Sequence, residues 1–155
     1  MNKKYIAIIV ILLVAGLAFL VYMAGESGYL RDEKSSQLER TERQKDHPEL
    51  LIKDIETGEG PTVQSSDTVE VHYIGRLEDG SVFDSSYDKG RTFTFKLDKG
   101  RVILGWEIGV EGMKKGGKRI LTIPPELAYG EGGVRGMVPP NSTIVFEIEL
   151  IEIKD

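Results

Sequence analysis

The 155-residue chain contains no cysteine, one tryptophan and only two histidines, His47 and His72. The lack of cysteine excludes disulfide bonds, thiolate catalysis, cysteine-ligated zinc or iron–sulfur sites and lipid attachment to an N-terminal cysteine. HExxH, GxSxG and Walker A motifs are also absent, and the acidic residues do not follow a metal-ligand spacing. We therefore expect a protein that works without a metal or cofactor.

The chain has no excess of basic residues either, since its formal net charge is −5. This balance argues against nucleic acid as a partner. A chain of this length has room for one domain with appendages. The composition divides it into an N-terminal apolar segment (residues 1–24), a polar segment (residues 25–48) and a β-rich segment (residues 49–155).

Residues 5–24 contain no charged side chain, and two lysines precede them. Twenty residues of helix span about 30 Å, the hydrocarbon thickness of a bilayer. The alternative is a cleaved signal peptide, whose apolar region is shorter and ends in a small-x-small site. Val21-Tyr22-Met23 is not such a site. We predict an uncleaved single-pass membrane anchor at the cell membrane, with residues 25–48 as a flexible tether and the remaining domain outside the cytoplasm.

The segment after residue 48 alternates apolar and polar residues in several short runs, which is typical of half-buried strands. We predict strands over residues 50–56, 68–77, 82–86, 92–97, 118–123 and 143–153. Residues 126–141 are expected to form a long loop. Together with a single short helix, these strands predict an α+β domain in which an antiparallel sheet wraps around the helix.

The predicted helix lies within Arg101–Met113. Ile103, Trp106, Val110 and Met113 share one helical face, and Glu107 and Glu111 are expected on a solvated face. Three glycines weaken this helix by about 1 kcal/mol each relative to alanine, so it needs a sheet to lie on. Trp106 is either an ordinary core residue or the floor of a pocket, and periodicity favours the core.

Aromatic residues are plentiful around this helix. Their polar tips need hydrogen-bond partners when buried, and Asp84 directly follows Phe83 at the edge of the predicted cluster. The aromatic set is Tyr73, Phe83, Phe93, Phe95, Trp106, Tyr129 and Phe146.

Several motifs resemble those of the FKBP-type peptidyl-prolyl cis-trans isomerases, in one unbroken order over residues 49–155. They are Val71-His72-Tyr73-Ile74-Gly75, Leu77-Glu78-Asp79-Gly80, Phe83-Asp84-Ser85-Ser86, Val102-Ile103-Leu104-Gly105-Trp106-Glu107, Ala128-Tyr129-Gly130 and Val138-Pro139-Pro140-Asn141-Ser142-Thr143-Ile144-Val145-Phe146. The resemblance implies a half-barrel sheet around the helix and an apolar pocket for a proline ring. It also implies that the partners are proline-containing polypeptides and, in many members, macrolide inhibitors.

Carried over by position, the resemblance assigns catalytic roles to Phe83, Asp84, Trp106 and Tyr129. It assigns substrate binding to Tyr73, Phe93, Val102, Ile103, Met137, Val138 and Phe146. Trp106 would lie under the prolyl ring, while the Ile103 N–H and the Tyr129 hydroxyl would hold substrate carbonyls. Arg101, Lys89 and the Val134–Val138 loop tip depart from the better-known members, which affects sequence preference and drug affinity. The alternative function is a docking module with a degenerate pocket.

Overall fold

The structure is a computed structural model that describes residue 38, residues 45–47 and residues 49–154. The predicted anchor and most of the predicted tether lie outside these residues. The chain divides into two units, Met1–Gln37 and Leu38–Asp155, and the folded domain belongs to the second. No helix in the described part of the chain is long and apolar enough to cross a membrane.

Within this domain, six antiparallel strands form one sheet in the order β1–β5–β6–β2–β3, and β4 also pairs with β2. Each predicted strand is present, with its ends within one residue of the prediction. The strands are β1 (Leu51–Glu56), β2 (Thr68–Leu77), β3 (Val82–Ser85), β4 (Phe93–Lys96), β5 (Lys118–Ile123) and β6 (Ile144–Lys154).

Strand β2 lies at the centre of the sheet. It pairs with β6 from Thr68, opposite Lys154, to Leu77, opposite Ile144. On its other side it pairs with β4 near its beginning and with β3 near its end. Alternate residues of β2 are buried, as a period of two requires, so one face of the strand supplies the core.

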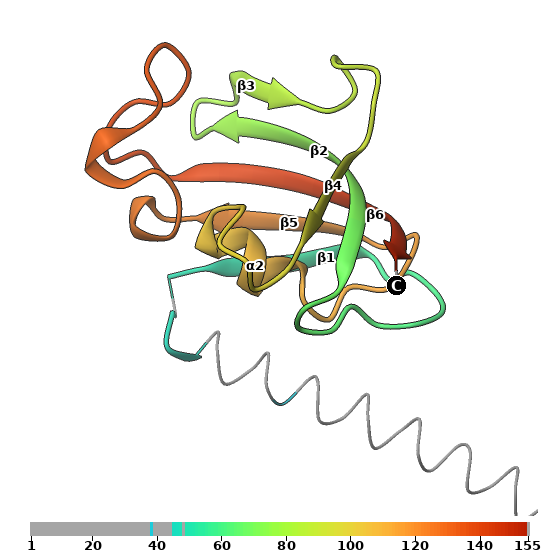
Figure 1. Ribbon diagram of the computed structural model, residues 1–155. Helices are drawn as coiled ribbons and strands as arrows, with labels where there is room; N and C mark the ends of the chain where they lie inside the picture. The colour runs from blue at the N-terminus through green and yellow to red at the C-terminus, as the bar shows by residue number, and fades with distance from the viewer. Residues whose placement is uncertain (1–37, 39–44, 48, 155) are drawn as a thin grey trace, which may run out of the picture. The chain divides into compact units, whose positions relative to one another are not determined.

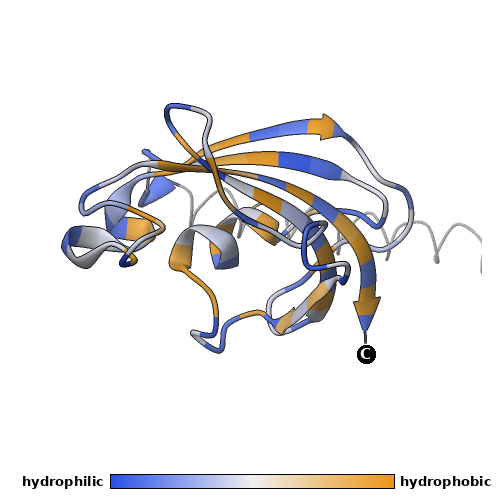
Figure 2. Ribbon diagram, turned by 90° about the horizontal axis from the view of Figure 1, so that it is seen from above, coloured by the Kyte–Doolittle hydropathy of each residue, from blue (hydrophilic) through white to orange (hydrophobic). Residues whose placement is uncertain are grey.

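The helix α2 (Leu104–Val110) lies on the concave side of this curved sheet (Figure 1). Hydrophobic and hydrophilic residues alternate along the strands that arch over it (Figure 2). A Cβ atom on Gly105 would lie 2.4 Å from Ile123 Cγ2, and one on Gly109 would lie 2.4 Å from Leu121 Cδ1. The glycines that weaken the helix in isolation therefore allow it to approach β5 closely.

The prediction of a solvated helix face was wrong. Glu107 is only 7% exposed and Glu111 is fully buried. The loop before the helix covers Glu107, and the Gly100 N–H in this loop donates to Glu107 Oε1 at 2.9 Å. The connection between β1 and β2 runs beside the helix end, where the Val63 N–H donates to the Met113 carbonyl at 2.8 Å. Both sides of this short helix are thus covered by polypeptide.

Arg119 is an inward-facing charge that the strand pattern did not predict. Its side chain is 2% exposed, and its Nη1 donates to the carbonyls of Gly109 at 2.7 Å and Glu111 at 3.0 Å. Its Nε donates to Asp54 Oδ1 at 2.5 Å, and its Nη2 donates to Asp54 Oδ2 at 3.1 Å. Arg119 therefore satisfies carbonyls at the C-terminal end of α2 and joins the helix to β1 and β5.

The predicted loop between β5 and β6 contains two short 3₁₀ turns, η1 (Pro125–Leu127) and η2 (Gly130–Gly132). Beyond them, Val134 and Val138 form an isolated antiparallel bridge that closes the tip of the loop. Val138 is buried at 3% exposure, whereas Met137 is 45% exposed.

Candidate active site

A cavity of about 980 Å³ lies where β2, β4, the start of α2 and the loop after η1 meet. Eight of the eleven residues predicted for the site line it, although they come from segments far apart in the sequence. These residues are Tyr73, Asp84, Phe93, Val102, Ile103, Trp106, Tyr129 and Phe146.

Trp106 lies at the centre of the aromatic cluster around this cavity. Its ring centroid is 5.0 Å from that of Phe146 and 5.2 Å from that of Tyr73, in both cases edge to face. The indole is 4% exposed, and its Nε1 has no hydrogen-bond partner among the described residues. Trp106 thus supplies an apolar wall that is held from several sides. It is core residue and pocket wall at once, which resolves the two alternatives left by its position on the helix.

Phe93 lies at the mouth of the cavity. Its side chain is 38% exposed. Its ring lies 6.1 Å from both Tyr73 and Trp106 and stacks on Phe95 at 5.6 Å. The ring of Phe93 thus packs on the aromatic cluster, while the cavity leaves much of it accessible.

Asp84 is held on one wall by three donors. The Tyr73 hydroxyl donates to its Oδ2 at 2.8 Å, while the Ser85 N–H at 2.8 Å and Lys89 Nζ at 2.5 Å contact its Oδ1. Burial by itself would raise the pKa of Asp84, but the hydrogen bonds from Lys89 and Tyr73 outweigh it, so the pKa lies below its ordinary value. The carboxylate is therefore charged at neutral pH.

Lys89 and Tyr73 complete this polar network. Lys89 Nζ donates to the Tyr73 hydroxyl at 3.0 Å and lies 5.5 Å from the centre of its ring. Burial raises the pKa of Tyr73, and the hydrogen bond to Asp84 raises the pKa of Lys89. The tyrosine therefore stays neutral, and the lysine balances the charge of the carboxylate.

Two further hydrogen-bond donors, one in a side chain and one in the backbone, face the cavity. Among the described residues, none accepts a hydrogen bond from the Tyr129 hydroxyl or from the Ile103 N–H. Burial raises the pKa of Tyr129, so its hydroxyl keeps its proton at neutral pH. Ile103 is the N-cap residue of α2 and therefore has no helical acceptor for its N–H. Both donors are available to carbonyl groups of a ligand.

Three predicted site residues do not line the cavity. Phe83 is half-buried behind it, with its ring edge-on to Phe146 at a centroid distance of 5.5 Å. Met137 and Val138 lie in the loop tip, the former exposed and the latter buried. The structure thus brings together the aromatic wall, Asp84 and the two donors, and places the loop-tip pair apart from them.

Ser86 is a residue of the site that sequence reasoning missed. It is 1% exposed, its Oγ accepts from the Tyr73 N–H at 2.8 Å, and its own N–H donates to the Tyr73 carbonyl at 3.0 Å. It thereby fills the gap between β3 and β4 along the edge of β2 and fixes the backbone of Tyr73. Its place in Phe83-Asp84-Ser85-Ser86 was the available signal, but that motif was used only for the resemblance.

Comparison with known proteins agrees with this arrangement. The family model described as FKBP-type peptidyl-prolyl cis-trans isomerase matches residues 60–151. The crystal structure of AtFKBP13 superposes with a TM-score of 0.64 at 42% identity, covering 68% of this chain and 93% of that one.

Two curated relatives match 105 residues, or 68% of this chain. FK506-binding protein 4 of Emericella nidulans is 54% identical, and the match covers 22% of its length. The FKBP-type peptidyl-prolyl cis-trans isomerase FkpA of Escherichia coli K12 is 51% identical, and the match covers 38% of its length. The chain thus spans between a fifth and two fifths of these relatives. Since the family model covers more than half of the chain, this protein belongs to the FKBP-type peptidyl-prolyl cis-trans isomerase family.

Proposed function

We propose that this protein accelerates cis–trans rotation about X–Pro bonds in polypeptides. The observation that carries the proposal is an aromatic cavity with two donors at its wall, the Ile103 N–H and the Tyr129 hydroxyl, that have no partner among the described residues. The reaction breaks no covalent bond, so it needs no nucleophile, metal or cofactor. Uncatalysed rotation costs about 18–20 kcal/mol because amide resonance must be lost.

The cavity lowers this barrier by preferring the twisted amide. A twisted amide has less charge separation than a planar one. Transfer from water to an apolar environment therefore favours the twisted amide relative to the planar one. The prolyl ring lies against Trp106, and the two donors hold carbonyl groups on either side of the rotating bond. These contacts orient the substrate. They also accelerate the rotation to the extent that they are stronger with the twisted amide than with the planar one.

Asp84 acts in this scheme through its fixed negative charge beside the cavity. Its partners Tyr73 and Lys89 hold the carboxylate in place, and no proton transfer is required of it.

The rim formed by Val102 and Ile103 favours apolar residues before proline. Because relatives are named for binding FK506, we also propose that macrolides of this kind occupy the cavity and inhibit the reaction.

The decisive experiment measures exchange between the cis and trans forms of an X–Pro peptide by NMR, with the full-length chain in detergent. Acceleration that a macrolide abolishes is expected. The control is Trp106→Ala, which removes the cavity wall, with circular dichroism to verify its fold. A folded wild-type protein that leaves exchange at its uncatalysed rate would replace this proposal with that of a docking module.

We further propose that residues 5–24 anchor the protein in the cell membrane, with the domain outside the cytoplasm. The support is the uncharged 20-residue run and the two lysines before it. Such a domain would meet exported chains at the membrane surface, where slow prolyl steps delay folding. Protease added to cells without an outer wall should release the domain while cytoplasmic markers stay intact. Recovery of a soluble protein that begins after Met23 would instead show a cleaved signal peptide.

A further inference from the structure

A second cavity of about 710 Å³ lies beside the first one. We name it the basic groove, and its lining is Thr68, Phe93, Thr94, Phe95, Lys96, Lys99 and Arg101. It shares Phe93, Thr94 and Arg101 with the first cavity, which we call the prolyl cavity. A polypeptide that leaves the prolyl cavity past Phe93 therefore enters the groove.

Every charged side chain that lines the groove is basic. Lys96, Lys99 and Arg101 are exposed, and none of them forms an ion pair within the described part of the chain. Four other lysines of the described residues have carboxylate partners, among them Lys115 with Glu152 at 2.5 Å and Lys154 with Glu70 at 2.6 Å. Since the chain as a whole carries a net charge of −5, its composition does not account for this basic cluster.

The acidic residues nearby in the sequence and sheet already have other contacts. Glu70 accepts from Lys154 at 2.6 Å and from Thr92 at 2.5 Å, and the carboxylate of Asp67 accepts from the Gln64 N–H at 2.8 Å. Asp98 is hydrogen-bonded to Ser65.

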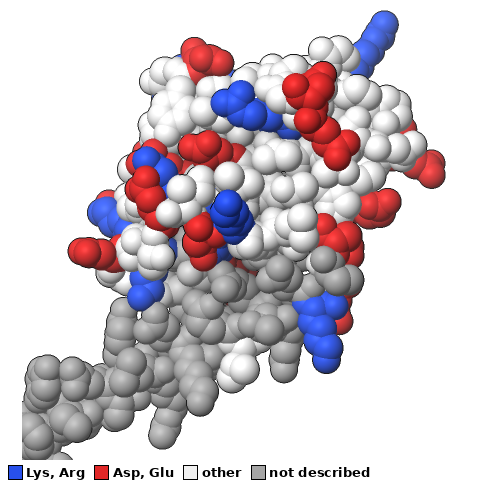
Figure 3. All heavy atoms as spheres, turned by 180° about the vertical axis from the view of Figure 1, so that it is seen from behind, with Lys and Arg blue, Asp and Glu red and all other residues white. Residues whose placement is uncertain are grey.

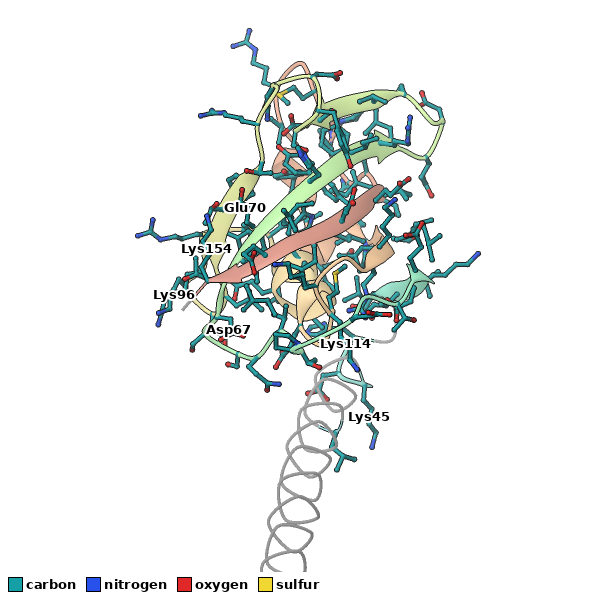
Figure 4. The ribbon with its side chains drawn as sticks, turned by 90° about the vertical axis from the view of Figure 1, so that its right-hand side faces the viewer. Lys45, Asp67, Glu70, Lys96, Lys114 and Lys154 are labelled. Atoms are coloured by element: carbon teal, nitrogen blue, oxygen red, sulfur yellow. The ribbon has the colours of Figure 1, made fainter. Side chains whose placement is uncertain are left out.

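Figure 4 shows Lys96 on the same side of the domain as the paired Lys154 and Glu70. Thr68 lies between Lys96 and Lys154 in the sheet register. On the face opposite to that of Figure 1, acidic and basic side chains are intermixed (Figure 3). The charge of the groove is thus of one sign, whereas that of the rear face is mixed.

We propose that the basic groove binds an acidic segment of the same polypeptide whose X–Pro bond lies in the prolyl cavity. Phe93, 38% exposed and stacked on Phe95, gives the two sites a common apolar wall. The two cavities share lining residues, so we place the acidic side chains about two to four residues from the proline, a span of roughly 7–13 Å in an extended chain. This inference rests on the proposed function and adds a preference for acidic clients.

The test compares two series of peptides around one X–Pro bond, one with glutamates and the other with glutamines, placed two to four residues before or after the proline. With the full-length protein at low salt, kcat/KM for the better-placed acidic peptide should exceed that for its glutamine counterpart by about three- to tenfold, the range of one or two exposed ion pairs. Roughly 0.5 M salt should remove most of this difference, since screening then acts within a few ångströms.

The test variant is Lys96→Glu/Lys99→Glu, and the control is Lys45→Glu/Lys53→Glu, which changes the net charge equally at exposed residues that line neither cavity. The test variant should lose the preference for glutamate while keeping its rate with the glutamine peptide. The control should keep both. Circular dichroism verifies the fold of each variant.

Other outcomes overturn the inference in distinguishable ways. Equal rates for both peptides in the wild-type protein would show that the groove takes no acidic client segment. Loss of binding to anionic vesicles in the test variant, with unchanged peptide preference, would assign the groove to a membrane surface. If no peptide is isomerised, the proposed function fails, and fluorescence anisotropy of labelled acidic and glutamine peptides still tests the groove by itself.

Discussion

The Tyr73 hydroxyl and Asp84 Oδ2 lie 2.8 Å apart, and Lys89 contacts both side chains. The two residues sit on neighbouring strands, where Gly75 is opposite Asp84 in the register of β2 and β3. This geometry fixes a carboxylate at the wall of an apolar cavity. The protonation state of Asp84 therefore depends on Tyr73 and Lys89, and substitution of each side chain tests this dependence.

We expect Asp84→Val to lower kcat/KM for an X–Pro peptide while the protein stays folded. The folded-state pKa of Asp84 is lowered, so the charged form stabilises the fold above the ordinary pKa of an aspartate. That contribution is lost as the pH falls through the folded-state value. Because the carboxylate also stays charged over this range, activity that depends on it should stay constant from neutral pH down to about pH 4.

Lys89→Met should raise the pKa of Asp84, because it removes a hydrogen bond that lowers it. The acid limb of the kcat/KM profile should then move to higher pH, while the rate at neutral pH changes little. Profiles of the wild-type protein and the variant, recorded at constant ionic strength, provide the measurement. Coincident acid limbs would show that Asp84 does not control the reaction.

Tyr129→Phe should weaken macrolide binding without changing stability. Since no described residue accepts a hydrogen bond from the hydroxyl, its removal leaves no protein group unsatisfied. The lost hydrogen bond to the ligand should cost about 0.5–1.5 kcal/mol. Isothermal titration calorimetry gives the affinity, and urea denaturation the stability. An unchanged affinity would mean that the hydroxyl does not contact the ligand.

Gly109→Ala should destabilise the protein, although alanine is the better helix former by about 1 kcal/mol. The added Cβ would lie 2.4 Å from Leu121 Cδ1, so the helix or the buried Leu121 side chain must move, at a cost of about 1–3 kcal/mol. Leu104→Ala, at a helical position that is 48% exposed, is the matched control. Urea denaturation reports the free energy of unfolding, and a Gly109→Ala variant at least as stable as the wild type would contradict the close approach.

Arg119→Met should destabilise the domain by about 2–4 kcal/mol, because the Gly109 and Glu111 carbonyls lose their donor. Asp54→Asn should cost less, since the asparagine oxygen still accepts from Arg119 and this side chain is 46% exposed at that position. Thermal unfolding of both variants gives the comparison. The reverse order would show that the ion pair, rather than the contact with the helix carbonyls, is the main contribution of Arg119.

Local patterns predicted the strands well, because a period of two is decided by neighbours along the chain. Burial around the helix was less predictable. Glu107 and Glu111 look solvated on a helical projection, yet the loop before the helix and the connection between β1 and β2 cover this side of it. Arg119 occupies an inward position on β5 that an alternation rule assigns to an apolar residue, and only the nearby helix end explains it.

The site was predicted unevenly for the same reason. The eight residues that line the cavity were reached through the family resemblance, which carries positions in space that composition does not. The resemblance assigned both Met137 and Val138 to substrate binding, but the turn at the loop tip exposes the former and buries the latter. The basic groove could not be predicted, because a sequence does not show that Lys96, Lys99 and Arg101 have no carboxylate partner among the described residues.

The pairing of β2 on both sides has a consequence for hydrogen exchange. β6 covers one edge of the strand, while β4, Ser86 and β3 together cover the other. Its amide protons are therefore expected to exchange only when the whole domain unfolds. Because β2 carries Tyr73, the part of the cavity wall that Tyr73 forms cannot open by itself. A bound ligand should slow the exchange of these amides by the full factor with which it stabilises the fold, so they report occupancy of a site that most of them do not touch.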